Sequence, residues 1–350
     1  MDMKTDITRL VRANIRVLSP YSTARDEYQG SLGVFLDANE NPYENGYNRY
    51  PDPRQTKIRE RLSEIKGMPV ENIFTANGSD EAIDLLMRIF CTPGKANIVA
   101  ISPSYGMYGV SAAINDVQLR EVPLREDFSL DADSVLAACD SQTRLVFLCS
   151  PNNPSGNALD RSAMLRIIRE SGCMVVIDEA YADFSSQGSL RSLVKEYANL
   201  VVLQTLSKAW GLAALRLGIA FADSHVVKLM GMVKYPYNIS KASQEAVLKA
   251  LEQPVDGQVK VIVEERGRLA GVISAMDFVM KVWPSDANFL LVKVEDADRL
   301  YEFLIGEGII VRNRNRVRSC AGCLRMTVGR PEENDALIAA LEKYSKQRKG

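Results

Sequence analysis

Residues 174–208 of the chain read MVVIDEAYADFSSQGSLRSLVKEYANLVVLQTLSK. Two short apolar runs in this stretch, at 174–177 and 200–203, have no polar alternation, which is typical of strands covered on both faces in a mainly parallel sheet. Polar residues follow each run, with DEAY at 178–181 and TLSK at 205–208. The stretch therefore predicts an α/β fold with functional side chains at the carboxyl ends of its strands.

Similar segments occur earlier in the chain. Short apolar runs lie at 72–74, 98–101 and 145–148. Apolar residues at helical spacing occur between the runs, at 80–90, 131–139 and 160–170. Strands that alternate with helices in this way predict a mainly parallel sheet with helices packed against it.

The pattern changes after Pro254. A long charged helix is predicted over 257–276, and the elements predicted after it indicate a smaller α+β domain: strand 288–294, helix 297–307, strands 309–311 and 324–328, and a final helix. The N-terminal segment has weak periodicity and several turn signals, as expected of an arm that packs on something else. We therefore expect an arm over 1–45, a large domain over 46–255 and a small domain over 256–350.

The composition argues against several classes of protein. The 43 basic and 44 acidic residues leave a net charge of −1, so no overall field attracts nucleic acid or an anionic membrane. The chain has no run of roughly eighteen apolar residues, and its start lacks the apolar centre of a signal peptide, which predicts a cytoplasmic protein. The single histidine, His225, is predicted to lie at a solvated helix start, which argues against serine-histidine or cysteine-histidine catalysis.

The cysteines have no regular spacing. Four of the six lie among apolar neighbours, as expected of buried thiols in a reducing compartment. Cys320 and Cys323 form a CxxC pair, but a zinc site would need a second pair of ligands. We expect this pair to be structural and the protein to bind no metal.

Two charged residues follow buried strands and need partners. Asp178 ends the run at 174–177, where an isolated carboxylate would cost several kcal/mol. Lys208 follows a similar run and could meet Asp178 in a purely structural ion pair. Alternatively, Asp178 meets the protonated ring nitrogen of a ligand to which Lys208 bonds covalently.

Two loops have the composition of ligand-binding segments. Asn77-Gly78-Ser79-Asp80 opens a helix, so it is either an ordinary helix cap or a cradle of free N–H groups for a phosphate. SPNNPSG at 150–156 holds two asparagines between prolines, which fixes the backbone. That rigidity favours a ligand contact over a simple turn.

Together, these segments resemble the fold-type I, aspartate-aminotransferase-like enzymes that use pyridoxal phosphate (PLP). SKAWGLAALRLG at 207–218 is similar to the PLP-lysine signature of that family, and SPNNPSG, DEAY and LRMTVG (324–329) are similar to its other motifs in the same order. Departures such as Ser155, where threonine is commoner, concern packing rather than chemistry. The resemblance implies a large PLP-binding domain with a mainly parallel seven-stranded sheet and a smaller α+β domain. It also implies that the N-terminal arm at 1–45 contributes to the small domain and to a dimer contact.

The resemblance also implies a role for each site residue. Lys208 would carry the cofactor as a Schiff base and move the proton at the substrate's α carbon, while Asp178 would keep the cofactor's ring nitrogen protonated. Asn153 and Tyr181 would hydrogen-bond the ring's phenolate oxygen. Tyr105 would stack on the ring face, although by itself it would suit a core position equally well. The implied phosphate ligands are Ser79, Asp80, Thr205, Ser207 and Arg216.

Further motifs are similar to those of the histidinol-phosphate aminotransferases. They are NENP at 39–42, YPDP at 50–53, GSDE at 78–81 and an arm-like segment, LSPYSTARDEY, at 18–28. This branch implies transamination between L-histidinol phosphate and 2-oxoglutarate in histidine biosynthesis. It also implies a homodimer in which Tyr50 reaches the other subunit's cofactor phosphate, although Tyr50 would also suit a plain turn.

The resemblance implies substrate contacts at Asn39, Tyr21, Arg312 and Arg325. Arg325 matches the arginine that binds the α-carboxylate of amino acids, and Arg312 matches one that contacts the substrate phosphate. From the residues alone, Arg312, Arg314 and Arg316 alternate along an extended segment, so they form either a basic rim of the site or a solvated face. Arg312 directly follows the apolar run and is best placed to point inward.

Alternatives of two kinds remain at this point. An aromatic aminotransferase or a threonine-phosphate decarboxylase of the same fold would share most of these residues. A PLP-bearing transcription regulator would need a DNA-binding segment, but the sequence shows no helix-turn-helix arm or basic patch before the domain. A catalytically idle scaffold would be recognised by an absorption spectrum that glutamate does not change.

Overall fold

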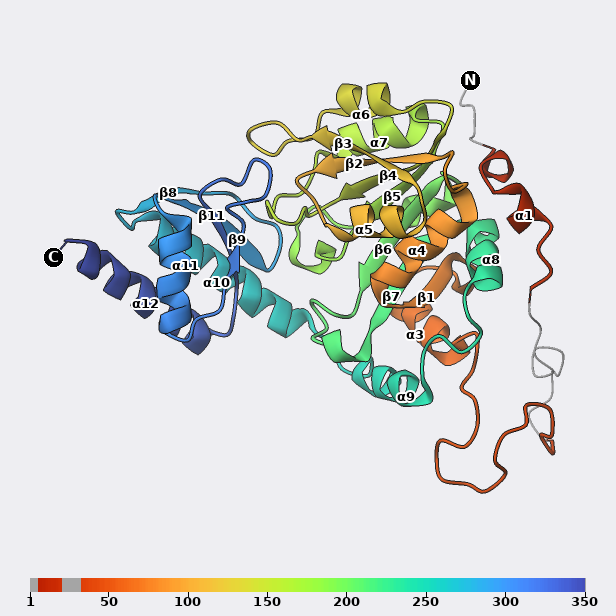
Figure 1. Cartoon of the computed structure of the whole chain (residues 1–350). Coiled ribbons are helices and arrows are strands. Elements are labelled where there is room, and N and C mark those ends of the chain that lie inside the picture. The colour runs from red at the N-terminus through yellow and green to blue at the C-terminus, as the bar shows by residue number, and fades with distance from the viewer. Residues whose placement is uncertain (1–5, 21–32, 350) are drawn as a thin grey trace.

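Two sheets organise the chain in the computed structural model, which describes residues 6–20 and 33–349 (Figure 1). The larger sheet has seven strands in the order β1-β7-β6-β5-β4-β2-β3. Its strands are β1 (Ile73–Asn77), β2 (Asn97–Ser102), β3 (Gln118–Pro123), β4 (Thr143–Cys149), β5 (Met174–Asp178), β6 (Leu200–Thr205) and β7 (Leu217–Ala222). Only β7 runs antiparallel to its neighbours, so the predicted, mainly parallel sheet is confirmed.

The apolar runs did not predict two strands of this sheet. β3 is an edge strand in which Val122 is the only buried residue, so its sequence is largely polar. β7 reads LGIAFA, and its small residues reflect close packing: a Cβ atom on Gly218 would lie 2.4 Å from the backbone nitrogen of Ser79. β3 lacks a continuous apolar run, and β7 is continuously apolar but alternates bulky residues with Gly218, Ala220 and Ala222.

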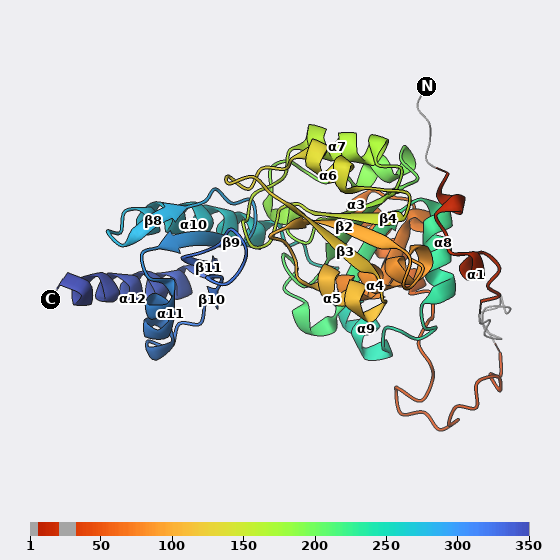
Figure 2. The same cartoon turned by 45° about the horizontal axis from the view of Figure 1, so that its top comes forward.

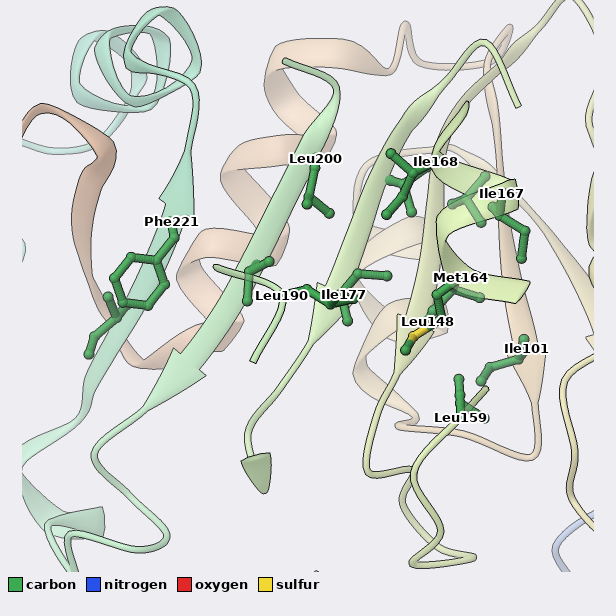
Figure 3. Close-up of a cluster of buried hydrophobic side chains, with 14 of the residues drawn as sticks. Ile101, Leu148, Leu159, Met164, Ile167, Ile168, Ile177, Leu190, Leu200 and Phe221 are labelled. Atoms are coloured by element: carbon green, nitrogen blue, oxygen red, sulfur yellow. The ribbon is translucent and has the colours of Figure 1, made fainter. Parts of the chain in front are cut away.

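Helices cover both faces of the large sheet, because alternate residues of its strands point to opposite sides. The first face packs against α3 (Thr56–Lys66), α6 (Ala132–Ala138), α7 (Arg161–Glu170) and α9 (Lys241–Ala250). Figure 3 shows part of this layer, where Leu148 and Ile177 belong to the same buried cluster as Met164 of α7. The second face packs against α4 (Gly78–Phe90), α5 (Met107–Ile114) and α8 (Ser224–Val233). Each fully buried aliphatic side chain in these layers contributes about 1.5–3 kcal/mol.

The smaller sheet lies to one side of the larger one and is reached through the long helix α10 (Figures 1 and 2). Its strand order is β10-β11-β9-β8, and all its pairs are antiparallel. The elements of this part are α10 (Asp256–Ser274), β8 (Val279–Val282), β9 (Phe289–Val294), α11 (Ala297–Gly306), β10 (Arg312–Asn313), β11 (Cys323–Thr327) and α12 (Pro331–Lys349). The sequence did not predict β8.

The strand predicted at 309–311 is wrong. The Ile309 N–H donates to the Leu304 carbonyl at 2.8 Å and so closes the end of α11, and Ile310 is 75% exposed. Pairing with β11 begins only at Arg312. An apolar run that terminates a helix has the same local composition as a short strand, and for this reason the sequence pattern predicted a strand here.

The described N-terminal segment packs through η1 (Ile7–Arg9) and α1 (Ala13–Arg16), whose isoleucines join the layer under α4. Residues 33–55 form no helix or strand and include a long loop that extends away from the sheets (Figures 1 and 2). The other short helices are η2 (Val70–Asn72), η3 (Ala182–Phe184), η4 (Arg191–Lys195) and η5 (Ala213–Leu215). Among the described residues, no helix has the length and apolar character needed to cross a membrane.

The remaining local predictions concern His225 and the cysteines. His225 is exposed in the first turn of α8, and its backbone N–H donates to Asp223 at 2.8 Å, as predicted for a helix start. All six cysteines are free thiols. Cys320 and Cys323 are both fully buried where the chain enters β11, which suits the packing role expected of them.

Candidate active site

A pocket opens at the carboxyl ends of β2, β4, β5 and β6, where α4 begins. It encloses about 500 Å³, part of which is open to solvent. The residues that line it are Ser79, Asp80, Tyr105, Cys149, Asn153, Asp178, Ala180, Tyr181, Thr205, Ser207, Lys208 and Arg216. The structure therefore brings together every predicted cofactor contact except Tyr50, along with Cys149 and Ala180, which the sequence did not single out.

Asp178 lies at the base of the pocket as the last residue of β5, and it is 2% exposed. Its carboxylate accepts hydrogen bonds from the Tyr108 hydroxyl at 2.8 Å and from the Ala180 N–H at 3.1 Å. Burial raises the pKa of Asp178, and these two hydrogen bonds oppose that rise. The carboxylate is thus held in one position by donors too weak to replace a cationic partner.

Tyr108 is a site residue that sequence reasoning missed. It lies fully buried in α5 and stacks on Phe147 with ring centroids 4.8 Å apart. Burial raises the pKa of its hydroxyl, which therefore remains a hydrogen-bond donor to Asp178. A tyrosine on an apolar helix face gave no local signal, because the two residues meet only in the folded sheet.

Lys208 follows β6 and extends into the same pocket. Its Nζ atom lies 5.5 Å from the centroid of the Tyr181 ring, and the structure forms no ion pair between Lys208 and Asp178. Burial lowers the pKa of Lys208, and the nearby Arg325 lowers it further. This geometry disfavours the purely structural ion pair and leaves the amine available to a ligand.

An anion cradle lies at the start of α4. Gly78 has a φ of 76°, and a Cβ atom there would lie 2.6 Å from Nη2 of Arg216. Arg216, itself left-handed with a φ of 54°, aims its guanidinium at the first turn of the helix, with Nη1 3.5 Å from the Ser207 hydroxyl. Backbone N–H groups in a first helical turn lack partners within the helix, so those of Ser79 and Asp80 are available to an anion together with Arg216.

The side chains around the cradle are already ordered. The Asp80 carboxylate accepts a hydrogen bond from the Tyr105 hydroxyl at 3.0 Å and lies 3.7 Å from Nη2 of Arg216. The Thr205 hydroxyl accepts from the Ser207 N–H at 3.1 Å and donates to the Leu217 carbonyl at 3.3 Å. Asp80 thus orients one wall of the pocket, and Thr205 stabilises the turn before Lys208.

Arg325 brings the small sheet into contact with the pocket. Its Nη1 atom donates to Oδ1 of Asn153 at 2.5 Å, and its guanidinium lies 5.1 Å from the centroid of the Phe289 ring. The Nε atom of Arg325 is buried and has no hydrogen-bond partner among the described residues. An arginine held on one side with a free edge on the other is suited to bind a carboxylate.

The other predicted substrate and cofactor contacts are not among the residues that line the pocket. Asn39 is exposed with a φ of 55°, and Tyr21 lies outside the described residues. Tyr50 is 48% exposed and stacks on Tyr237 with ring centroids 4.3 Å apart, away from its own chain's pocket. Arg312 is exposed on β10. Asn39, Tyr50 and Arg312 therefore do not line the pocket of their own chain.

The residues of the pocket fit the cofactor that the motifs implied. A buried carboxylate suits a protonated ring nitrogen, an amine with a lowered pKa suits a carbonyl, and the glycine-lined cradle suits a phosphate. Tyr105, held by Asp80, forms an aromatic wall between these groups. A flat ring that carries a nitrogen, a carbonyl and a phosphate, as PLP does, matches this set.

Comparison with known proteins agrees with this chemistry. The family described as aminotransferase class I and II matches residues 32–341. A histidinol-phosphate aminotransferase of Parabacteroides distasonis is 52% identical over 339 residues, covering 96% of this chain and 98% of the relative. One from Cytophaga hutchinsonii is 45% identical over 348 residues, covering 98% and 100%.

Solved structures share the fold. The histidinol-phosphate aminotransferase of Clostridium acetobutylicum superposes with a TM-score of 0.78 at 21% identity, covering 85% of this chain and 91% of the other. The enzyme of that name from Sinorhizobium meliloti, solved in complex with pyridoxal 5'-phosphate, gives a TM-score of 0.77 at 23% identity, covering 85% and 83%. Both likenesses concern the fold alone.

Proposed function

The chain belongs to the class I and II aminotransferase family, and from this premise we propose that it transfers an amino group between L-histidinol phosphate and 2-oxoglutarate with PLP as its cofactor. The products are imidazole-acetol phosphate and L-glutamate, a step of histidine biosynthesis. The observation that carries the proposal is the pocket, which combines a buried carboxylate, an amine with a lowered pKa and an anion cradle. The names of the full-length relatives support the choice of substrate.

PLP, when bound, supplies an electron sink for the bond that breaks at the substrate's α carbon. Lys208 anchors the cofactor and moves the proton at that carbon, and its lowered pKa increases the fraction of free amine near neutral pH. Asp178 holds the positive charge of the ring nitrogen, and the donors Tyr108 and Ala180 keep its carboxylate in place. Asn153 and Tyr181 complete the hydrogen bonds to the ring.

Arg325 binds the α-carboxylate of glutamate in this proposal. Its contact with Asn153 links substrate binding to the residues around the cofactor. Histidinol phosphate has no α-carboxylate, so its phosphate must bind other cations nearby, and Arg312 and Tyr21 are the contacts we propose for it. Asn39 is proposed as a further substrate contact from the arm.

We assign the active form to a cytoplasmic homodimer with shared sites. Tyr50 supports this, because it is half exposed and lies outside its own pocket, where it could serve a second copy. The loop that carries it extends away from both sheets (Figure 2). In the dimer, Tyr50 contacts the cofactor phosphate of the other subunit.

A substrate comparison tests the proposal. Purified holoenzyme is mixed in single turnovers with histidinol phosphate, phenylalanine or threonine phosphate while its visible spectrum is recorded. We expect the fastest spectral change with histidinol phosphate, coupled to glutamate formation in steady state. Faster turnover of phenylalanine would favour an aromatic aminotransferase, and release of carbon dioxide from threonine phosphate would favour a decarboxylase.

A further inference from the structure

Three arginines gather where the small sheet meets the pocket. Burial raises the pKa of Tyr181 in the pocket wall, and the nearby Arg325 and Arg314 oppose that rise. Arg312 on β10 pairs directly with Arg325 on β11, so both side chains lie on one face of the sheet. Arg314 follows by two residues, and its backbone N–H donates to the Cys323 carbonyl at 2.9 Å, which keeps it beside β11. Asn313 points to the opposite face, where its amide donates to Asp298 at 2.6 Å.

Arg316 does not belong to this cluster. The chain turns at 315–316, and the Val317 N–H donates to the Arg314 carbonyl at 2.9 Å, so the alternation predicted along the segment ends at Arg314. Hydrogen bonds from Asn313 and Asn315 lower the pKa of Asp298, and the exposed Arg316 lowers it further. Arg316 therefore has an acidic neighbour on the outer side of the sheet.

The cluster itself has no counter-charge. Within the described parts of the chain, no carboxylate forms an ion pair with Arg312, Arg314 or Arg325. The Nε atoms of Arg314 and Arg325 are both buried without a hydrogen-bond partner in the described structure. Arg314 is half buried, whereas Arg312 is exposed. Unpaired guanidinium groups this close together are unfavourable unless an anion binds between them.

We propose that Arg314 is a specificity-determining residue that selects a substrate phosphate over a substrate carboxylate. This inference rests on the proposed function and deepens it. Arg325 has one side engaged by Asn153 and suffices for a carboxylate, which carries a single charge and two oxygens. A phosphate dianion carries twice the charge and three oxygens, so it gains most from the additional half-buried guanidinium of Arg314.

The experiment compares Arg314→Gln with Arg316→Gln as a matched control on the same segment. Holoenzyme of each variant is assayed with histidinol phosphate, with its phosphate-free alcohol histidinol, and with glutamate. For Arg314→Gln we expect kcat/KM for histidinol phosphate to fall about ten-fold to a hundred-fold, mainly through KM. The value for histidinol should stay unchanged, and that for glutamate should fall less than that for histidinol phosphate. Arg316→Gln should match the parent enzyme with all three.

A binding measurement gives a second readout. Inorganic phosphate should raise the melting temperature of the parent holoenzyme more than that of Arg314→Gln, and Arg314→Lys should recover part of both effects because it restores a charge without the fork of donors. Equal losses with histidinol phosphate and histidinol would overturn the selective role. Parent enzyme that used glutamate but not histidinol phosphate would refute the proposed function. Normal parent turnover with an unaffected Arg314→Gln would refute only the role of Arg314.

Discussion

Lys208 is the residue on which the proposed chemistry depends most. Burial lowers its pKa, and no carboxylate of the described chain neutralises it within 4 Å, so the fold leaves its amine free for a covalent bond to the cofactor. Replacement by alanine removes that bond but leaves the cradle around Arg216 intact. The loss should therefore fall on covalent attachment and proton transfer rather than on folding.

We expect Lys208→Ala to bind PLP only noncovalently and to lose transamination, with an unchanged melting profile in the absence of cofactor. Borohydride reduction of the parent holoenzyme, followed by peptide mapping, should place the pyridoxyl group on Lys208. Lys66, a buried lysine that pairs with Asp183 at 3.2 Å outside the pocket, is a suitable control for modification. A label on any other lysine would refute the assignment.

Burial of the Asp178 carboxylate in the site lowers the stability of the folded protein. Burial raises its pKa above the ordinary 3.8, so the folded chain binds this proton more tightly than the unfolded chain. The carboxylate therefore destabilises cofactor-free protein above its folded-state pKa. That cost fades as the pH falls through the window between the raised pKa and 3.8, and it is absent below that window.

We expect Asp178→Asn to stabilise cofactor-free protein by about 1 to 3 kcal/mol at pH 7, and the gain should disappear near pH 3. Urea unfolding at a series of pH values measures this change in stability.

The same variant should lose about 3 to 5 kcal/mol of transition-state stabilisation for proton removal when PLP is present. A variant with near-normal kcat would contradict the role given to Asp178.

At the scale of elements, the anion cradle depends on contact between β7 and α4. Gly218 of β7 lies against the first turn of α4, where a Cβ atom would be 2.4 Å from the backbone nitrogen of Ser79. Backbone atoms cannot move aside as a flexible side chain can, so any side chain at 218 must separate the strand from the helix. The Gly78 and Arg216 contacts would shift with them.

We expect Gly218→Ala to cost about 1 to 3 kcal/mol of unfolding free energy and to weaken PLP retention. Gly271→Ala in α10 is the matched control, because a Cβ atom there meets nothing within 4 Å. That change should stabilise the protein by about 0.5–1 kcal/mol through helix propensity. Denaturant melts and cofactor dialysis measure both variants, and similar behaviour of the two would mean that this contact does not shape the cradle.

At the scale of the whole molecule, the position of Tyr50 bears on the assembly of two chains into a dimer. It stacks on Tyr237 outside the pocket of its own chain, and the loop that carries it extends away from the sheets (Figure 1). Tyr50 does not line the pocket of its own chain, and the proposed homodimer assigns it to the site of the other subunit. The proposed homodimer therefore predicts that lesions in two chains can complement each other.

We expect Tyr50→Phe to retain PLP less tightly while the dimer stays assembled. Heterodimers of Tyr50→Phe and Lys208→Ala chains should contain one site with both lesions and one with neither, so activity should recover toward half that of the parent enzyme. Sedimentation verifies assembly, and differently tagged chains allow isolation of the heterodimer. If verified heterodimers showed no recovery, each site would have to be formed within one subunit.

The sequence by itself determined the character of the large sheet and predicted which polar residues lie at the ends of its strands. Strands buried on both faces require continuous apolar runs, so β2, β4, β5 and β6 could be recognised locally. The polar residues that end such strands meet at one edge of a parallel sheet, and for this reason Asp178 was expected to lie near Lys208. Both inferences depend only on the hydrophobicity and the polar ends of short stretches of the chain.

Only the tertiary structure decided which distant side chains meet. Tyr108 and Asp178 are 70 positions apart, and Arg325 and Asn153 are 172 apart, so their contacts depend on strand order and on the position of the small sheet. Arg314 is half buried and Arg312 is exposed, although both have the same local pattern. The local sequence pattern indicates whether a residue favours burial or solvent. The partner of a charged side chain depends instead on the packing of elements that are far apart in the chain.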